Sequence, residues 1–201
     1  MPMANNSDKA LILKALEFAA ERHRTQFRKG LDRTPFINHP VQVASLLAND
    51  AGETDTDLLA AAILHDVIED TVSSVAEKNE LVQTMHEIFG TSITSIALEV
   101  TDDKTIEKKD RKRLQVENAP FVSLRAKKLR IADKIMNIRD ITANPPEDWT
   151  LQRIADYFDW AEKVVAGLRG VNLKLEMMFD ESLARGRMKY GFMRSEDSEL
   201  P

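Results

Sequence analysis

The stretch LLAAAILHDVIEDT, residues 58–71, decides the fold and raises the question of function. Its first half is an unbroken run of small and branched apolar residues, which is typical of a helix buried on every side. Its second half carries His65, Asp66, Glu69 and Asp70. Carboxylates this close repel one another unless a cation or a shared proton offsets their charge. The pattern therefore favours a cation near the end of a buried helix.

The composition restricts the class of protein. The chain has 201 residues, 43% of them hydrophobic, with only seven Gly and seven Pro, which favours a single, mostly helical domain. It has no cysteine, which excludes disulfides and thiol nucleophiles and suits a reducing cytoplasm. No apolar run approaches the ~18 residues of a membrane span, and the N-terminus has no charged leader before an apolar stretch. We therefore expect a soluble cytoplasmic protein with no membrane partner.

Hydrophobic spacing predicts an all-α bundle without strands. The expected helices cover residues 7 to about 29, 38 to about 51, 57–70, 81–89, a further one through 96–100, a charged one to about 118, 124–141, and one long segment from 151 through 175. We expect one helical domain over residues 1–185 and a polar, frayed tail over residues 186–201.

Basic residues are concentrated in one part of the chain. The formal net charge is −5, yet the segment 104–130 contains ten Lys and Arg against three acidic residues. A solvated helix face explains such a run, and a polyanionic partner is the alternative. Nucleic acid is disfavoured, because the sequence has no zinc finger or aromatic-rich sheet motif and is acidic overall.

Histidine and acidic residues from separate segments form a candidate metal site. On a helix, positions three and four apart share a face, so His65 lies beside Glu69, and Asp66 lies beside Asp70. His39 stands at the start of another expected helix. Imidazole and carboxylate together suit Mn, Fe, Zn or Mg.

A later segment supplies a further acid. Asp133 and Asn137 are four residues apart on an otherwise apolar helix, and a buried Asp without a partner is costly. Asp133 can bind a cation or pair with a basic neighbour such as Lys134 or Arg130. With His39, His65 and Asp66 it completes the pattern H…HD…D, with spacers of 25 and 66 residues.

At this point the sequence resembles the HD-domain phosphohydrolases, and within them the hydrolase domain of RelA/SpoT alarmone enzymes. The stretches that carry the resemblance are RKGLDRTPFINHP (28–40), LLAAAILHDVIEDT (58–71), VTDDKTIEKKDRKRLQVENAP (100–120), AKKLRIADKIMNIRD (126–140) and YFDWAEKVVAGLRG (157–170). They cover most of the chain in order. The 28–40 and 111–120 stretches are most similar to the stand-alone small alarmone hydrolases of metazoa and bacteria.

The resemblance implies an HD-domain helical bundle that hydrolyses ppGpp and pppGpp to GDP or GTP and pyrophosphate with one manganese ion. It assigns the metal ligands to His39, His65, Asp66 and Asp133, the water-activating acids to Glu69 and Asp70, and substrate binding to Arg28, Lys29, Lys108, Asn137, Arg153 and Tyr157. One departure is Phe36, where relatives usually carry Tyr, so the hydroxyl and its hydrogen bond are absent.

Two other functions stay open. The first is another HD phosphohydrolase activity, on ppApp-type alarmones, NADPH or deoxynucleotides, since all of these could use the same metal and acids. The second is a non-catalytic module that binds alarmone and signals by shape, which the retention of all the ligands and both acids disfavours. The sequence does not indicate the oligomeric state.

Overall fold

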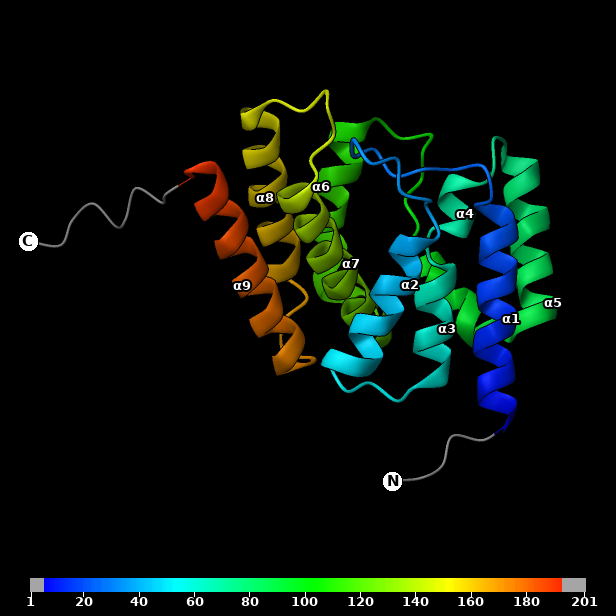
Figure 1. The fold of residues 1–201 in the computed structure, drawn as a ribbon. Coiled ribbons are helices and arrows are strands. Elements are labelled where there is room, and N and C mark those ends of the chain that lie inside the picture. The colour runs from blue at the N-terminus through cyan, green and yellow to red at the C-terminus, as the bar shows by residue number, and fades with distance from the viewer. Residues whose placement is uncertain (1–5, 193–201) are drawn as a thin grey trace, which may run out of the picture.

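The computed structural model describes residues 6–192, and in this range the named secondary-structure elements are all helices (Figure 1). The elements are α1 (Asn6–Arg22), α2 (Asn38–Ser45), the π-helix η1 (Leu46–Asp50), α3 (Thr56–Leu64), α4 (Val67–Asp70), α5 (Val75–Val100), α6 (Lys108–Asn118), the 3-10 helix η2 (Ala119–Phe121), α7 (Leu124–Ala143), α8 (Leu151–Ala166) and α9 (Leu173–Tyr190). Extended pairing within residues 6–192 is limited to two isolated bridges, Phe27 with Pro35 and Gly30 with Pro146. The all-α prediction is confirmed.

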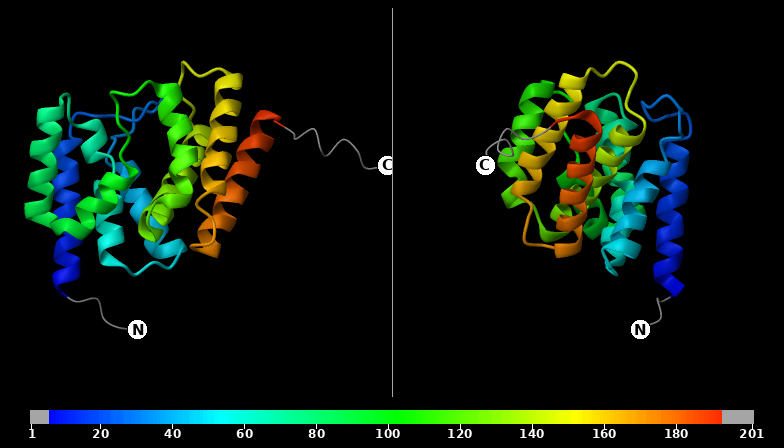
Figure 2. Two further views of the ribbon diagram at one scale, coloured as in Figure 1. Left: turned by 180° about the vertical axis from the view of Figure 1, so that it is seen from behind. Right: turned by 60° about the vertical axis from the view of Figure 1, so that its left-hand side comes forward.

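Helix α7 is the centre of the bundle. It contacts α2, α3, α5, α8 and α9, and it lies between the α8–α9 pair and the group formed by α1, α3 and α5 (Figures 1 and 2). Its side chains Leu129, Ile131, Ile135 and Ile138 are fully buried. Each such burial stabilises the fold by about 1.5–3 kcal/mol. Because α7 is covered on several faces, its polar residue Asp133 is carried into the interior as well.

The prediction of one continuous helix over residues 57–70 is wrong at His65 and Asp66. α3 ends at Leu64, residues His65 and Asp66 form a turn, and α4 then adds one further helical turn. The His65 Nδ1–H donates to the Ala62 carbonyl over 2.7 Å. That carbonyl is the acceptor a continuing helix would use, so the side chain competes with the helix at this point.

Of two other helix boundaries, one agrees with the prediction and one differs from it. The predicted break between the helices at 81–89 and 96–100 is confirmed, because α5 is kinked at Gly90, whose φ of +80° and ψ of 170° are not helical, and two helical segments meet there. The long segment expected from residue 151 through 175 is instead two helices, α8 and α9. Gly170 has a φ of +89°, which favours glycine, and the Asn172 side chain caps α9 by accepting the Leu175 N–H over 3.1 Å.

The C-terminal ends of α1 and α9 also differ from the boundaries that the sequence predicted. α1 stops at Arg22, sooner than the expected end near residue 29, and α9 continues past residue 185 to Tyr190. The rings of Tyr190 and Phe192 stack with centroids 5.7 Å apart. The domain division at residue 185 stays a prediction, and residues 193–201 of the expected tail lie outside the described residues. No helix in the described part of the chain combines the length and apolar character that a membrane crossing needs.

Candidate active site

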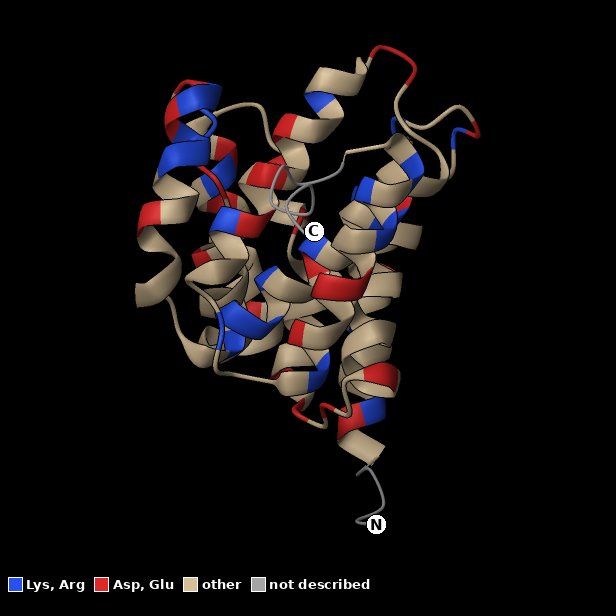
Figure 3. Cartoon of the chain, turned by 90° about the vertical axis from the view of Figure 1, so that its left-hand side faces the viewer, with Lys and Arg blue, Asp and Glu red and all other residues tan. Residues whose placement is uncertain are grey.

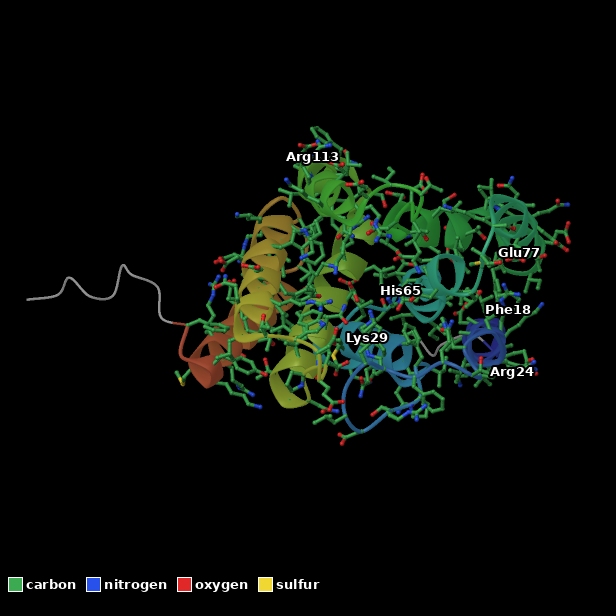
Figure 4. All side chains as sticks on the ribbon, turned by 90° about the horizontal axis from the view of Figure 1, so that it is seen from above. Phe18, Arg24, Lys29, His65, Glu77 and Arg113 are labelled. Carbon is green, nitrogen blue, oxygen red and sulfur yellow. The ribbon has the colours of Figure 1, made fainter. Side chains whose placement is uncertain are left out.

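A cavity of about 1020 Å³ is lined by residues from α2, α4, α6, α7 and α8 and from the loop that follows α1. It contains every residue that the sequence placed in the site: His39, His65, Asp66, Asp133, Glu69, Asp70, Arg28, Lys29, Lys108, Asn137, Arg153 and Tyr157. Lys29 and His65 lie toward the middle of the molecule, whereas Arg113 lies at its outer edge (Figure 4). Lys and Arg gather along α6 (Figure 3), which forms one wall of the cavity.

The four expected metal ligands converge from α2, the α3–α4 turn and α7. His39 Nε2 lies 3.1 Å from Asp133 Oδ1, and His65 Nε2 lies 3.8 Å from the same oxygen. Ligand atoms of His39, His65 and Asp133 all lie within 4.8 Å of one another, a spacing that can hold a metal ion. The two oxygens of Asp66 face different imidazoles, 3.2 Å from His65 Nε2 and 3.8 Å from His39 Nε2.

The backbone orients the His65 ring toward this centre. Because Nδ1 donates to the Ala62 carbonyl, Nε2 faces the carboxylates and is the ring atom that a metal ion would bind. Nε2 is buried and has no hydrogen-bond partner of good geometry among residues 6–192. A buried polar atom without a hydrogen-bond partner is costly, and a divalent cation would satisfy it. The donor set therefore fits a metal ion.

The charges of the centre are strongly coupled. Burial by itself lowers the pKa of His65, but the carboxylates of Asp66 and Asp133 outweigh it and raise the pKa to about 9. Burial would raise the pKa of Asp133, yet Lys134 and His39 hold that pKa well below its usual range. The pKa of Asp66 is lowered for a similar reason, because His65 and His39 outweigh its burial. The carboxylates of the centre are thus ionised, and a bound metal ion would displace the proton that they hold on His65.

Side chains around Asp133 fix its orientation. Lys134 Nζ bonds to Asp133 Oδ2 over 3.0 Å, and Asn137 Nδ2 donates to Asp133 Oδ1 over 2.6 Å. Arg28 Nη2 in turn donates to Asn137 Oδ1 and to Asp140 Oδ2, both over 2.7 Å. The sequence left a Lys134 pairing open as an alternative to metal binding, and the structure shows that Asp133 contacts both Lys134 and the histidines. The two interpretations are therefore compatible.

Glu69 on α4 has the environment of a proton acceptor. Its Oε2 accepts the backbone N–H of Asp102 over 3.0 Å. Burial is the main cause that raises the pKa of Glu69 to about 7, and the neighbouring acids Asp102, Asp70 and Asp66 add to it. A carboxyl group with a pKa near the working pH is well suited to take a proton from water.

Asp70 is held differently. Its carboxylate pairs with Lys104, which is half exposed, and its backbone carbonyl accepts the Gln26 side-chain N–H over 2.6 Å. The Lys104 contact was not expected from the sequence, because Lys104 lies in the loop before α6 and is 34 residues away along the chain. Salt bridges at such exposed positions contribute little to stability, so the pair mainly orients the carboxylate.

Cations and aromatic rings form the walls that face a ligand. The Arg153 guanidinium lies 4.6 Å from the Trp149 ring centroid and pairs with Asp148. Lys29 and Lys108 line the cavity and form no ion pair among residues 6–192. Tyr157 is partly buried, and this desolvation raises its pKa above the usual range, so it stays a neutral hydrogen-bonding group.

The structure adds wall residues that the sequence did not single out. Lys112 and Lys134 both direct their ammonium groups to the Trp160 ring, 4.7 and 4.8 Å from its centroid. The signal for Lys112 was present, since it stands four residues after Lys108 on a helix and so shares its face. Nothing in the sequence indicated Trp160, because its position depends on how α8 packs against α6.

Comparison with known proteins agrees with this geometry. Residues 15–158 match the family model described as HD domain. The chain belongs to the HD domain family. This HD domain is 49% identical over 184 residues to guanosine-3′,5′-bis(diphosphate) 3′-pyrophosphohydrolase MESH1 of Xenopus tropicalis, covering 89% of the chain and 99% of that protein. It is 47% identical to the protein of the same name from Homo sapiens, over 85% of the chain and 91% of the relative.

More distant comparisons place the HD domain relative to larger enzymes and solved structures. The bifunctional (p)ppGpp synthase/hydrolase SpoT of Escherichia coli is 32% identical over 68% of the chain, which is 19% of that protein. A solved structure described as a metazoan ortholog of SpoT that hydrolyzes ppGpp superposes with a TM-score of 0.81 and 41% identity, over 96% of this chain and 99% of the other. The resemblance to the RelA/SpoT hydrolase branch is confirmed.

Proposed function

We propose that this HD domain hydrolyses ppGpp and pppGpp, releasing pyrophosphate from the 3′ position and leaving GDP or GTP. One observation carries the proposal: His39, His65, Asp66 and Asp133 converge inside a cation-lined cavity, in a chain 47–49% identical to relatives named for this activity. The prediction of a cytoplasmic enzyme acting on a small nucleotide belongs to the same proposal.

We propose a single manganese ion as the cofactor. His39, His65, Asp66 and Asp133 would hold it with two nitrogens and two carboxylates, a set that suits manganese and leaves positions open. The chemistry that such an ion supplies is a lower pKa for a bound water and a polarised phosphoryl oxygen. The orphaned Nε2 of His65 supports this assignment.

The chain's own residues perform the proton transfer. Glu69 accepts the proton of the attacking water, since its pKa of about 7 leaves it partly ionised at neutral pH. Asp70, which follows it directly on α4, helps to orient that water. Asn137 and Arg28, which bond to each other over 2.7 Å, line the cavity beside the metal ligand Asp133 and face the nucleoside.

The cationic walls bind the phosphates of the substrate. Lys29 and Lys108, which form no ion pair in the described part of the chain, contribute ammonium groups, and Arg153 contributes a guanidinium 4.6 Å from the Trp149 ring centroid. Arginine offers bidentate geometry to phosphate, whereas lysine offers a point charge. Tyr157 adds a neutral hydroxyl to the lining of the same cavity. Such a wall favours a ligand with several phosphates over one with a single phosphate.

The decisive experiment is an assay of pyrophosphate release from ppGpp with manganese, repeated after chelation. We expect release that stops in chelator and returns when manganese is restored. A panel of pppGpp, ppApp, NADPH and deoxynucleoside triphosphates tests the alternative substrates. Turnover of NADPH or a deoxynucleotide without turnover of either guanosine alarmone would refute the proposal.

A second measurement separates catalysis from binding alone. Glu69→Gln keeps the shape of the side chain and its acceptor for the Asp102 N–H but cannot take a proton. We expect this variant to bind ppGpp and fail to cleave it. Equal inactivity of the wild-type protein and the variant, with binding retained in both, would favour the non-catalytic alternative.

A further inference from the structure

We propose that Asp102 and Gln115 position the catalytic Glu69 and couple it to the basic helix α6. Both line the cavity, and neither has a role in the function proposed above, on which this inference rests. Glu69 lies on α4, Gln115 lies on α6, and Asp102 lies in the loop that connects α5 to α6. The three residues form a continuous chain of hydrogen bonds across these elements.

The first link holds the carboxylate of Glu69. The Asp102 backbone N–H donates to Glu69 Oε2 over 3.0 Å, and it is the one hydrogen-bond donor to this carboxylate among residues 6–192. A general base must lie within hydrogen-bond reach of the water that it deprotonates. The place of the 101–102 backbone therefore decides where the base points.

The second link holds Asp102 itself. Gln115 Nε2 lies 2.8 and 2.7 Å from the two carboxylate oxygens of Asp102, so one amide group contacts both. Placing a second carboxylate beside Glu69 is unfavourable, and Asp102 contributes to the raised pKa of Glu69. An acid at this position has a cost that a neutral residue would avoid. Its contact with Gln115 is the compensating interaction.

The third link is helix α6, which carries Lys108, Arg111 and Lys112 on the cavity side. α6 has no fully buried side chain and contacts chiefly α8 and η2. Elements with little buried surface shift at low free-energy cost. Phosphates that draw α6 toward the cavity would move Gln115, and Gln115 would move Asp102 and the N–H that holds Glu69. Ligand binding on α6 is thereby coupled to alignment of the base.

The test uses the full chain with manganese and ppGpp, and measures kcat and KM separately. Gln115→Ala and Asp102→Ala should each lower kcat about tenfold, because a misplaced base slows the chemical step, while KM changes less than about twofold. The double variant should be no slower than the slower single variant, since both changes break one link. Asp102→Asn keeps an oxygen for Gln115 and should retain most of the activity.

The matched control is Gln83→Ala on α5, whose side chain bonds only to the exposed Glu87 over 3.1 Å among residues 6–192. It should leave kcat and KM unchanged. Urea titration of each variant confirms that the fold is retained. Three results would each overturn the inference: a kcat unchanged in both single variants, a KM that rises while kcat holds, or an Asp102→Asn variant as slow as Asp102→Ala. A wild-type protein inactive on ppGpp would instead remove the proposed function.

Discussion

The raised pKa of Glu69 predicts that removing its charge stabilises the metal-free protein, and its role as proton acceptor predicts that the same change greatly slows turnover. The ordinary pKa of 4.5 rises to about 7 in the folded chain. This difference corresponds to about 3 kcal/mol of unfavourable free energy for the ionised group above pH 7. Because Glu69 is only partly buried, water screens some of this cost, and we expect about 2 kcal/mol.

The sign follows from proton binding in the two states. Between pH 4.5 and 7 the folded chain holds a proton on Glu69 that the unfolded chain has released, so wild-type stability falls as pH rises through this window. Glu69→Gln removes that loss. The variant should therefore match the wild type near pH 4.5 and exceed it by about 2 kcal/mol at pH 8, while the Asp102 N–H keeps its acceptor.

Thermal and urea unfolding in chelator at pH 4.5, 6 and 8 measure this difference. For a chain of this size, about 2 kcal/mol is a rise in Tm of about 4–8 °C. Glu80→Gln on the exposed side of α5 is the control, and its effect should stay within about 0.5 kcal/mol at every pH. A Glu69→Gln variant that is no more stable than the wild type at pH 8, or equally favoured at all three pH values, would refute the reasoning. With manganese and ppGpp, kcat should fall by about 10²–10⁴.

Three further predictions follow from the centre, the walls and the core. Manganese at about one hundred times its Kd should stabilise the metal-free protein by about 2.7 kcal/mol in thermal melts, and His65→Ala should remove this stabilisation. An unchanged shift of Tm in the variant would exclude His65 as a ligand. Lys108→Ala and Arg153→Ala should each raise KM about fivefold or more with a smaller change in kcat, whereas Arg113→Ala, which pairs with acids on its own helix, should change neither; an unaltered KM in both cavity variants would remove the phosphate-binding role. Phe158→Ala, in the fully buried core, should lower the free energy of unfolding by about 3–5 kcal/mol in urea, and a loss below about 1 kcal/mol would contradict that packing.

The pattern of apolar residues was sufficient to predict a helical bundle. Spacing of three and four residues identifies α1, α7 and the start of α8, and the caps Ser123 and Thr150 lie where α7 and α8 begin. These signals are local, since a helix closes its hydrogen bonds four residues away. The points at which helices end or break were harder to predict from the sequence. The break at His65 depends on one side chain bonding to the Ala62 carbonyl, and no periodicity reports such a bond.

The sequence by itself determined the residue types of the site and, through their resemblance to a family, their expected grouping. Only the tertiary structure decided how they meet. Arg28 reaches Asp140 across 112 residues, and Asp102 reaches Glu69 across 33. Neither pair shares a helix, so neither has a spacing rule. Such contacts depend on where the ends of packed helices come to lie, which burial of the whole core around α7 sets. Local periodicity fixes what each helix buries, and packing fixes which polar groups then face one another.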